Sequence, residues 1–128
     1  MKRILLKLSG EALAGAEKKG FDEATVIAVA KQIRTIVEEG TQVGIVIGGG
    51  NFWRGRTSET IDRNKADQIG MLATVMNCIY VSDICRYLGL RTEIFTPFAC
   101  GAFTSLYSKD AVEAVSYTHL TLPTNSRV

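Results

Sequence analysis

The sequence has few of the residue types on which several common enzyme chemistries depend. It contains one histidine, His119, which lies in the atypical last thirteen residues and is assigned no role. Without a second histidine or a recognisable Ser-His-Asp set, we predict no hydrolase of that kind. The cysteines Cys78, Cys85 and Cys100 are odd in number and lack metal-ligand spacing. We therefore expect buried thiols in a reducing compartment, and no metal held by the protein alone.

The sequence also lacks a large excess of positive or negative charge, and it lacks long hydrophobic runs. The 15 Lys and Arg residues nearly balance 13 Asp and Glu residues, and no basic cluster suggests a nucleic-acid partner. Lys7 interrupts the apolar start, which argues against a signal peptide, and no segment approaches the ~20 apolar residues that a membrane span needs. We expect a cytoplasmic protein with neither a nucleic-acid nor a membrane partner.

The 128 residues do contain a regular alternation of strand and helix patterns. Short apolar runs predict strands at 3–8, 42–47 and 91–96, and the middle one is apolar enough to be covered on both faces. Apolar spacings of three and four predict helices at 22–39 and 66–88, with a shorter one at 108–115. This order predicts an α/β fold with a mainly parallel sheet and helices on its faces.

The longest predicted helix, 66–88, carries many large apolar residues. We expect these residues to form its core-facing side: Ile69, Leu72, Val75, Met76, Ile79, Ile84 and Tyr87.

The last thirteen residues differ from the rest of the chain. Segment 116–128 has no acidic residue, four Thr and two Ser, and no clear helical or strand period. It resembles translated adaptor sequence at the end of an open reading frame. We therefore divide the chain into a domain at 1–115 and a non-native or disordered tail at 116–128, a hypothesis that sequencing the source DNA beyond codon 115 would test.

Two glycine-containing turns follow the first two predicted strands. Ser9-Gly10 follows the first strand and Gly48-Gly49-Gly50 follows the second, so in a parallel sheet both turns lie at the same edge. Lys7 ends the first strand and Arg54 lies just beyond the triple glycine. Unhindered backbone N–H groups and two cations at one edge predict a phosphate site, although either turn alone could serve only as a tight turn.

The common phosphate-binding motifs are absent. The sequence has no Walker A loop, no G-x-G-x-x-G fingerprint, since Trp53 stands at the sixth position, and no protein-kinase motif set. Phe52 and Trp53 could stack on a base, but they more often pack a loop down. Asp67 suits the first turn of a helix and could equally accept hydrogen bonds from sugar hydroxyls, while Asp62–Arg63 could be a surface ion pair.

Three stretches resemble the bacterial UMP kinases, a branch of the amino acid kinase superfamily. They are K-L-S-G-E-A-L at 7–13, G-G-G-N-F-W-R-G at 48–55, and D-R followed by A-D-Q-I-G-M-L-A-T-V-M-N at 62–63 and 66–77. The last is the most specific, and the resemblance covers about residues 2 to 115. It implies a three-layer α/β/α sandwich, here truncated.

The resemblance also implies the chemistry. A UMP kinase moves the γ-phosphoryl group of ATP, accompanied by Mg²⁺, onto UMP in pyrimidine nucleotide biosynthesis. By the family pattern Lys7 and Arg54 would be catalytic, and Asp67 and Gly49 would bind UMP. The ATP-binding set would be Lys7, Leu8, Ser9, Gly10, Gly50 and Arg54.

Oligomerisation and regulation follow from the same resemblance. Family members are typically homohexamers, and many are activated by GTP and inhibited by UTP. The segment linked to GTP control would be Gly15, Ala16, Glu17, Lys18, Lys19 and Gly20, although it lacks the glycine and the aliphatic residue usual between Phe21 and Asp22.

The family's T-G-N-P-F-type loop, its second catalytic lysine and its adenine pocket are not found in this sequence, so the chain alone is expected to be inactive. Two alternatives stay open. One is a superfamily kinase with a carboxylate acceptor, such as acetylglutamate or aspartate, and the other is a catalytically silent nucleotide-binding or oligomerisation module.

Overall fold

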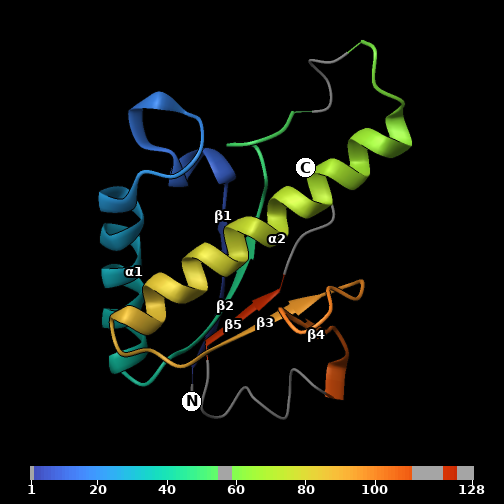
Figure 1. Ribbon diagram of the computed structural model, residues 1–128. Coiled ribbons are helices and arrows are strands. Elements are labelled where there is room, and N and C mark those ends of the chain that lie inside the picture. The colour runs from blue at the N-terminus through green and yellow to red at the C-terminus, as the bar shows by residue number, and fades with distance from the viewer. Residues whose placement is uncertain (1, 55–58, 111–119, 124–128) are drawn as a thin grey trace.

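The described residues fold around a five-stranded parallel sheet. The computed structural model describes residues 2–54, 59–110 and 120–123 (Figure 1). The strands are β1 (Arg3–Leu8), β2 (Gln42–Ile47), β3 (Thr92–Thr96), β4 (Ser105–Leu106) and β5 (Leu120–Pro123), in the spatial order β1-β2-β5-β3-β4. Every neighbouring pair is parallel, as the strand–helix alternation predicted. The two short strands β4 and β5 were not predicted.

Two helices cover one face of this sheet. Helix α1 (Glu23–Glu38) begins after Asp22, whose carboxylate accepts from Thr25 N, and it is followed by Gly40 at φ +92°. Helix α2 (Arg63–Tyr87) begins three residues earlier than predicted and is followed by Gly89 at φ +90°. Among the described residues no helix lies on the other face of the sheet, where β1 exposes Leu5 to 71%. The prediction that β2 is covered on both faces is therefore wrong for the described part, since its alternate residues are only half-buried.

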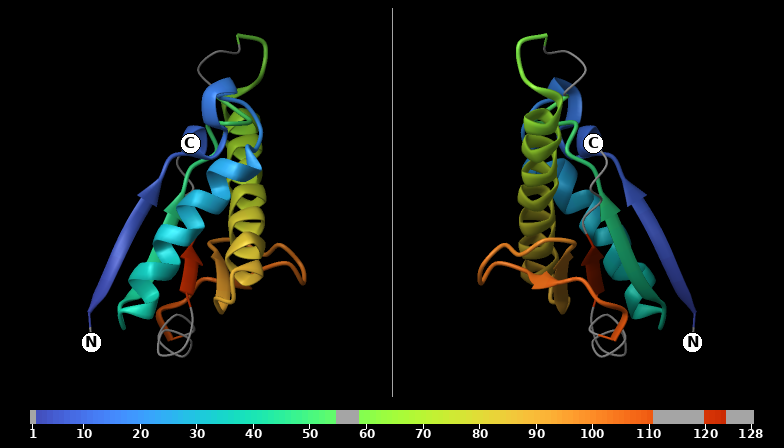
Figure 2. Two further views of the ribbon diagram at one scale, coloured as in Figure 1. Left: turned by 90° about the vertical axis from the view of Figure 1, so that its left-hand side faces the viewer. Right: turned by 90° about the vertical axis from the view of Figure 1, so that its right-hand side faces the viewer.

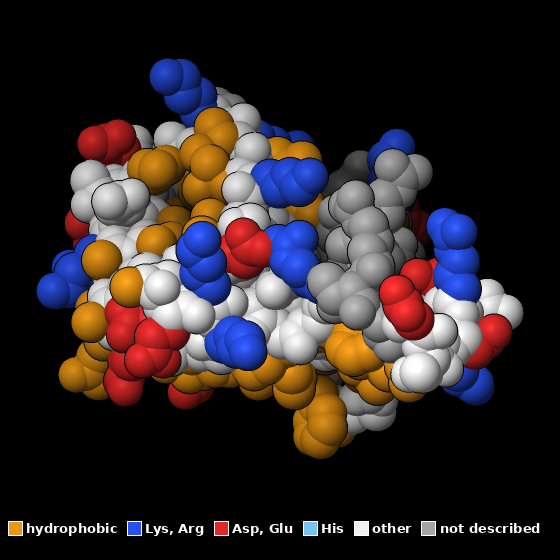
Figure 3. Space-filling view, turned by 90° about the horizontal axis from the view of Figure 1, so that it is seen from above, with side chains coloured by type: hydrophobic (Ala, Val, Ile, Leu, Met, Phe, Trp, Pro, Cys, Tyr) orange, Lys and Arg blue, Asp and Glu red, His pale blue; other side chains and the backbone are white. Residues whose placement is uncertain are grey.

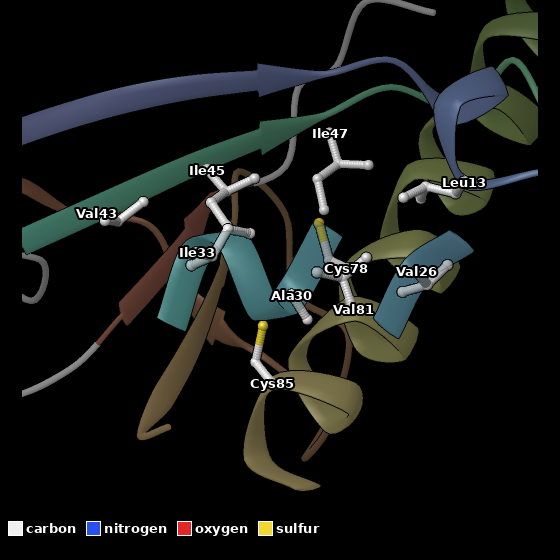
Figure 4. Close-up of a cluster of buried hydrophobic side chains, with 10 residues drawn as sticks. All are labelled: Leu13, Val26, Ala30, Ile33, Val43, Ile45, Ile47, Cys78, Val81 and Cys85. Atoms are coloured by element: carbon white, nitrogen blue, oxygen red, sulfur yellow. The ribbon is translucent and has the colours of Figure 1, made fainter. Parts of the chain in front are cut away.

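The core lies between β2, α1 and α2. Ten buried side chains converge there (Figure 4): Leu13, Val26, Ala30, Ile33, Val43, Ile45, Ile47, Cys78, Val81 and Cys85. The expectation of buried thiols holds for Cys78 and Cys85. Burial raises the pKa of Cys78 to about 12 and the pKa of Cys85 to about 11, because the apolar surroundings disfavour a thiolate.

The face of α2 that meets the core is not the face that the sequence predicted. Five of the seven large side chains assigned to the core are exposed, namely Ile69, Leu72, Met76, Ile79 and Tyr87. The buried residues are mostly small or polar: Ala66, Gly70, Ala73, Thr74, Val75, Asn77, Cys78, Val81, Ser82 and Cys85. The sheet and its loops lie close to this side of the helix. Small residues are buried there because only small side chains leave room for the backbone of the loops.

Helix α2 also has the length and composition of a membrane span. One 18-residue stretch of the helix has a mean hydropathy of 1.3, so the expectation that no segment is apolar enough was too strict. Half of that stretch is buried inside the protein, where α2 packs on α1 and the sheet. A core helix of a globular protein meets the same criterion, so its composition is weak evidence for a membrane.

Strand β5 lies within the segment that the sequence analysis separated as a tail. It pairs with β2 on one side and with β3 on the other, so four residues of segment 116–128 belong to the sheet. The remaining residues of that segment, and most of the helix predicted at 108–115, lie outside the described residues. A non-native origin of the segment stays a prediction.

Candidate phosphate site

The two glycine turns touch each other at the carboxyl edge of β1 and β2. Gly48 N donates to Leu8 O at 3.0 Å, which extends the parallel pairing into the turns. A Cβ on Gly10 would stand 2.5 Å from Asn51 Oδ1, 2.7 Å from Gly50 N and 2.9 Å from Gly48 O. No larger residue fits at Gly10, so the closeness of the turns explains this glycine.

The triple-glycine turn also rests on α2. A Cβ on Gly49 would lie 2.9 Å from Ala73 Cβ and 3.1 Å from Gly70 O. Gly48 differs, because a Cβ there would meet only Gly10 N, at 3.7 Å. Gly10 and Gly49 are thus fixed by packing, whatever ligand the turns bind.

A buried pair of asparagines holds the triple-glycine turn in place. Asn77 Nδ2 donates to Gly48 O at 2.6 Å and to Asn51 Oδ1 at 2.7 Å, and Asn51 Nδ2 donates to Asn77 Oδ1 at 3.1 Å. Asn77 is 0% and Asn51 2% exposed. Sequence reasoning gave neither residue a role, although an Asn among the apolar residues of a long helix was a signal that it needs a buried partner.

The segment proposed for GTP control is attached to the same turn. Gly20 N donates to Asn51 O at 3.0 Å, and Asn51 Nδ2 donates to Gly20 O at 2.8 Å. Within the segment, a short 3₁₀ turn spans Gly15–Glu17 and Lys18 adopts φ +61°. Residues 15–20 therefore brace the turn at 48–51, and their regulatory role stays a prediction.

The aromatic residues beside the turn pack it down. Phe52 meets Phe21 edge to face, with ring centroids 5.1 Å apart, and Phe21 stacks on Tyr80 at 3.8 Å. Trp53 N donates to Gly49 O, while its indole N–H is buried with no partner among the described residues. The packing interpretation holds for Phe52, which joins the turn to α2 through Phe21.

The two candidate cations occupy different positions at this edge. Arg54 lies over Gly50, with its Nη2 atom 3.1 Å from where a Gly50 Cβ would be, and it forms an ion pair with Glu11. Lys7 is exposed on the sheet face opposite the helices, and it makes no hydrogen bond or ion pair with the described residues. Arg54 is thus joined to both turns, whereas Lys7 lies beside them.

The two aspartates near the start of α2 have separate roles. Asp62 caps the helix, because its carboxylate accepts from Asn64 N at 3.2 Å. The helix begins at Arg63, so Asp67 lies beyond the first turn and the prediction that it serves the helix dipole there is wrong. Asp67 is exposed one helical turn before Gly70, and Gly70 is where α2 touches the triple-glycine turn.

A cavity in the described part of the chain lies away from these turns. It has a volume of about 590 Å³ and is formed by the second half of α2, β3 and the loop before β4. None of the predicted site residues lines it. The candidate site is instead an open edge, with Ser9 Oγ already accepting from Ala12 N at 3.2 Å.

Backbone N–H groups, an arginine and a lysine meet at the carboxyl edge of a parallel sheet, which is where α/β proteins bind their ligands, so this edge is the candidate anion site. The model of the amino acid kinase family matches residues 2–121, so the chain belongs to that family. The predicted α/β fold of this type is confirmed, and the described residues supply its sheet and one helical layer.

Comparison with known proteins supports the family branch. The chain is 50% identical over 93 residues to the uridylate kinase of Thermosipho melanesiensis and 45% identical over 112 residues to that of Fervidobacterium nodosum. These alignments cover 73% and 88% of this chain but 40% and 48% of the relatives, so the chain spans about half the length of the curated relatives it matches.

Solved structures that resemble this chain come from the same branch of the family. The crystal structure of UMP kinase from Bacillus anthracis matches with a TM-score of 0.89 at 31% identity, over 98% of this chain and 52% of that one. UMP kinase from Ureaplasma parvum matches with a TM-score of 0.88 at 27% identity, over 96% of this chain and 55% of that one.

Proposed function

We propose that this chain is the N-terminal part of a UMP kinase, which transfers the γ-phosphoryl group of ATP to UMP and yields UDP and ADP. The contact between Gly10 and the turn at 48–51 carries the proposal, because it brings two sets of backbone N–H groups and Arg54 to one edge. The similarity to proteins named uridylate kinase or UMP kinase supports the choice of substrate.

The proposed mechanism needs positioning and positive charge more than a base. The phosphate of UMP is already an oxyanion, so no proton has to leave the acceptor, and transfer depends on in-line placement. Arg54 and Lys7 would neutralise the charge that spreads over the transferred group. Leu8, Ser9, Gly10 and Gly50 would hold ATP through the first turn and its neighbour, and Gly49 and Asp67 would hold UMP.

Glu11 adds a condition to this mechanism. Its carboxylate pairs with Arg54, so a bound phosphate must share the guanidinium or displace Glu11 from it. Both side chains are about half exposed, at 54% for Arg54 and 40% for Glu11, so the exchange costs little in desolvation.

Mg²⁺ would enter this site with ATP. The described residues contain no group of three or more His, Cys, Asp or Glu side chains that could hold a metal ion. The donors at the turns suit phosphate oxygens instead, and Mg²⁺ bound to those oxygens would supply further positive charge.

The setting proposed for the enzyme is pyrimidine nucleotide biosynthesis in the cytoplasm. There the complete protein would act as a homohexamer under nucleotide control, with segment 15–20 as a candidate regulatory element. Its attachment to Asn51 offers a direct route from that segment to the phosphate turn.

Ligand-dependent thermal unfolding of the 128-residue chain tests the half-site. A ligand bound only by the native state raises the unfolding midpoint in a saturable way. We expect UMP and Mg-ATP each to raise it, and we expect Arg54→Gln to reduce the shift with Mg-ATP, while Arg34→Gln on α1 serves as the matched control. A midpoint indifferent to both nucleotides would contradict the proposal for this chain.

An acceptor panel tests the reaction in a protein completed with the second half of a close relative. We expect ADP formation with UMP and none with acetylglutamate or aspartate. Turnover of a carboxylate acceptor with UMP inert would reject the UMP kinase proposal, and binding without any turnover would favour a silent nucleotide-binding module.

A further inference from the structure

A carboxylate of the chain itself lies at the candidate phosphate site. Glu11 directly follows Gly10 and pairs with Arg54, whose Nη2 atom is 3.1 Å from where a Gly50 Cβ would be. Figure 2 shows β1 and β2 running toward this end of the molecule, and Figure 3 looks onto it and shows an acidic side chain flanked by basic ones. The ion pair therefore joins the segment after β1 to the segment after β2.

The backbone donors beside this pair differ from the guanidinium in their partners. Among the described residues the N–H groups of Gly10, Gly49 and Gly50 donate to no acceptor, whereas Gly48 N donates to Leu8 O. Successive N–H groups of this kind suit the oxygens of an anion. The guanidinium already holds an anion that belongs to the chain, while these backbone donors do not.

The local structure keeps Glu11 close to its partner. Gly10 has no room for a Cβ, so the backbone before Glu11 is fixed by packing. Ser9 Oγ accepts from Ala12 N at 3.2 Å, and Leu13, which ends the short 3₁₀ turn, is 0% exposed in the core. The carboxylate is thus tethered beside the guanidinium at a high effective concentration.

We propose that Glu11 is an internal competitor for phosphate at Arg54, and that a bound anion gains the guanidinium by displacing this carboxylate. The inference rests on the proposed function in one respect, namely that this edge binds phosphate groups. Carboxylate and phosphate oxygens both match the planar donors of a guanidinium, so the two anions exchange at one position. Glu11 therefore lowers the affinity for every ligand that uses Arg54 by one common factor.

Exchange differs from simple repulsion in its dependence on the charge of the ligand. Repulsion by a fixed carboxylate grows with the number of charges that the ligand carries. The cost of exchange belongs to the Glu11–Arg54 pair alone, so it is the same for a ligand of low or high charge. Both side chains are about half exposed, so the displaced carboxylate can turn into water, where it repels the ligand little.

Isothermal titration calorimetry of the 128-residue chain with tripolyphosphate tests the competition. This probe carries a triphosphate without base or sugar, so the result does not depend on the identity of the nucleotide substrates. We expect Glu11→Gln to lower the dissociation constant about three- to fivefold, the strength of a good surface ion pair. Inorganic phosphate, measured by its competition with tripolyphosphate, should bind more tightly by the same factor to within about twofold.

A double-mutant cycle and a matched control locate the effect at Arg54. Arg54→Gln should weaken the binding of tripolyphosphate, and adding Glu11→Gln to it should change the dissociation constant less than about 1.5-fold, because no pair is left to break. Glu39→Gln makes the same charge change at an exposed position at the end of α1 and should leave the dissociation constant unchanged. Thermal unfolding without ligand reports whether each variant is folded.

Three results would overturn the proposal. The first is weaker or unchanged binding of tripolyphosphate by Glu11→Gln, because the carboxylate would then position Arg54 or have no part in binding. The second is a gain that increases with the charge of the ligand, and the third is a gain that persists in the Arg54→Gln background. Failure of the parent chain to bind either anion at millimolar concentration would contradict the phosphate site itself, and the competition with it.

Discussion

The two faces of α2 are built from different kinds of side chain, and their arrangement is the reverse of an ordinary amphipathic helix. The inner face is made of small or polar residues, among them Gly70, Ala73, Thr74 and Asn77. On the opposite side of the helix Ile69, Leu72, Met76 and Ile79, here called the outer row, are large apolar residues that remain exposed. The difference indicates that distance to the neighbouring backbone, more than hydrophobicity, selects the inner residues.

The largest effect is expected where the inner face meets the triple-glycine turn. Gly49→Ala would place a Cβ 2.9 Å from Ala73 Cβ and 3.1 Å from Gly70 O, and the helix backbone cannot give way without cost. We expect a loss of ~3 kcal/mol in the free energy of unfolding, measured by urea denaturation at low protein concentration. Gly48→Ala is the matched control, since its Cβ would meet only Gly10 N at 3.7 Å. Equal losses for the two variants would contradict the packing argument.

A somewhat smaller effect is expected from the polar part of the inner face. Asn77→Leu removes the donors to Gly48 O and Asn51 Oδ1 and leaves these buried acceptors unsatisfied. The expected loss is ~2 kcal/mol, together with a weaker shift of the unfolding midpoint by Mg-ATP, because the turn is no longer held. Met76→Ala, one residue away on the outer row, should leave the nucleotide shift unchanged. A nucleotide shift preserved in Asn77→Leu would show that the pair does not position the turn.

The outer row should hardly affect the stability of the single chain. Leu72→Gln exchanges one exposed side chain for another, and we expect the free energy of unfolding of the monomer to change by no more than ~0.5 kcal/mol. Urea denaturation at low protein concentration measures this. A loss comparable to that of Asn77→Leu would mean that the row packs within the chain.

The smallest effect near neutral pH concerns the thiols of the inner face. Burial raises the pKa of Cys78 to about 12 and of Cys85 to about 11, from an ordinary value of 9.0. As pH rises, thiols of the unfolded chain ionise first, so the stability is fully present below pH 9 and is lost between pH 9 and the native pKa values. Cys100 is less buried than Cys78 and Cys85, so alkylation at about pH 8 should modify Cys100 first.

The pH dependence of unfolding reports on the two buried thiols. The unfolding midpoint of the parent chain should fall above about pH 9, because the thiols of Cys78 and Cys85 ionise more readily in the unfolded chain. Rapid alkylation of all three thiols in the native state would show that the inner face opens readily.

Sequence reasoning predicted the local elements well because their signals are local. Asp22, Gly40 and Gly89 are cap and stop residues that act through their own backbone, and the strand at 42–47 was placed at its observed bounds. The orientation of α2 could not be predicted in this way. Its large residues follow a helical period on the outer row, and nothing in one chain reveals that the sheet-side face must be small.

Only part of the candidate site could be predicted, namely the part that follows from the fold class. Parallel strands bring Gly10 and Gly48–Gly50 to one edge by geometry alone, so their proximity followed from the fold class. The Asn51–Asn77 pair and the Glu11–Arg54 ion pair depend on contacts between distant segments. Such partners can be recognised only when the packing of the loop on α2 is known.

The position of β5 has a consequence for the order in which the molecule forms. This strand follows β1 to β4 in the sequence but lies in the interior of the sheet, between β2 and β3. Before it is added, the β1–β2 and β3–β4 ladders have no strand between them, and their only connection runs through α2. Closing the sheet therefore requires contacts between residues far apart in sequence, which slows folding. During synthesis on the ribosome, β2 would wait with an unpaired edge until residues 120–123 emerge.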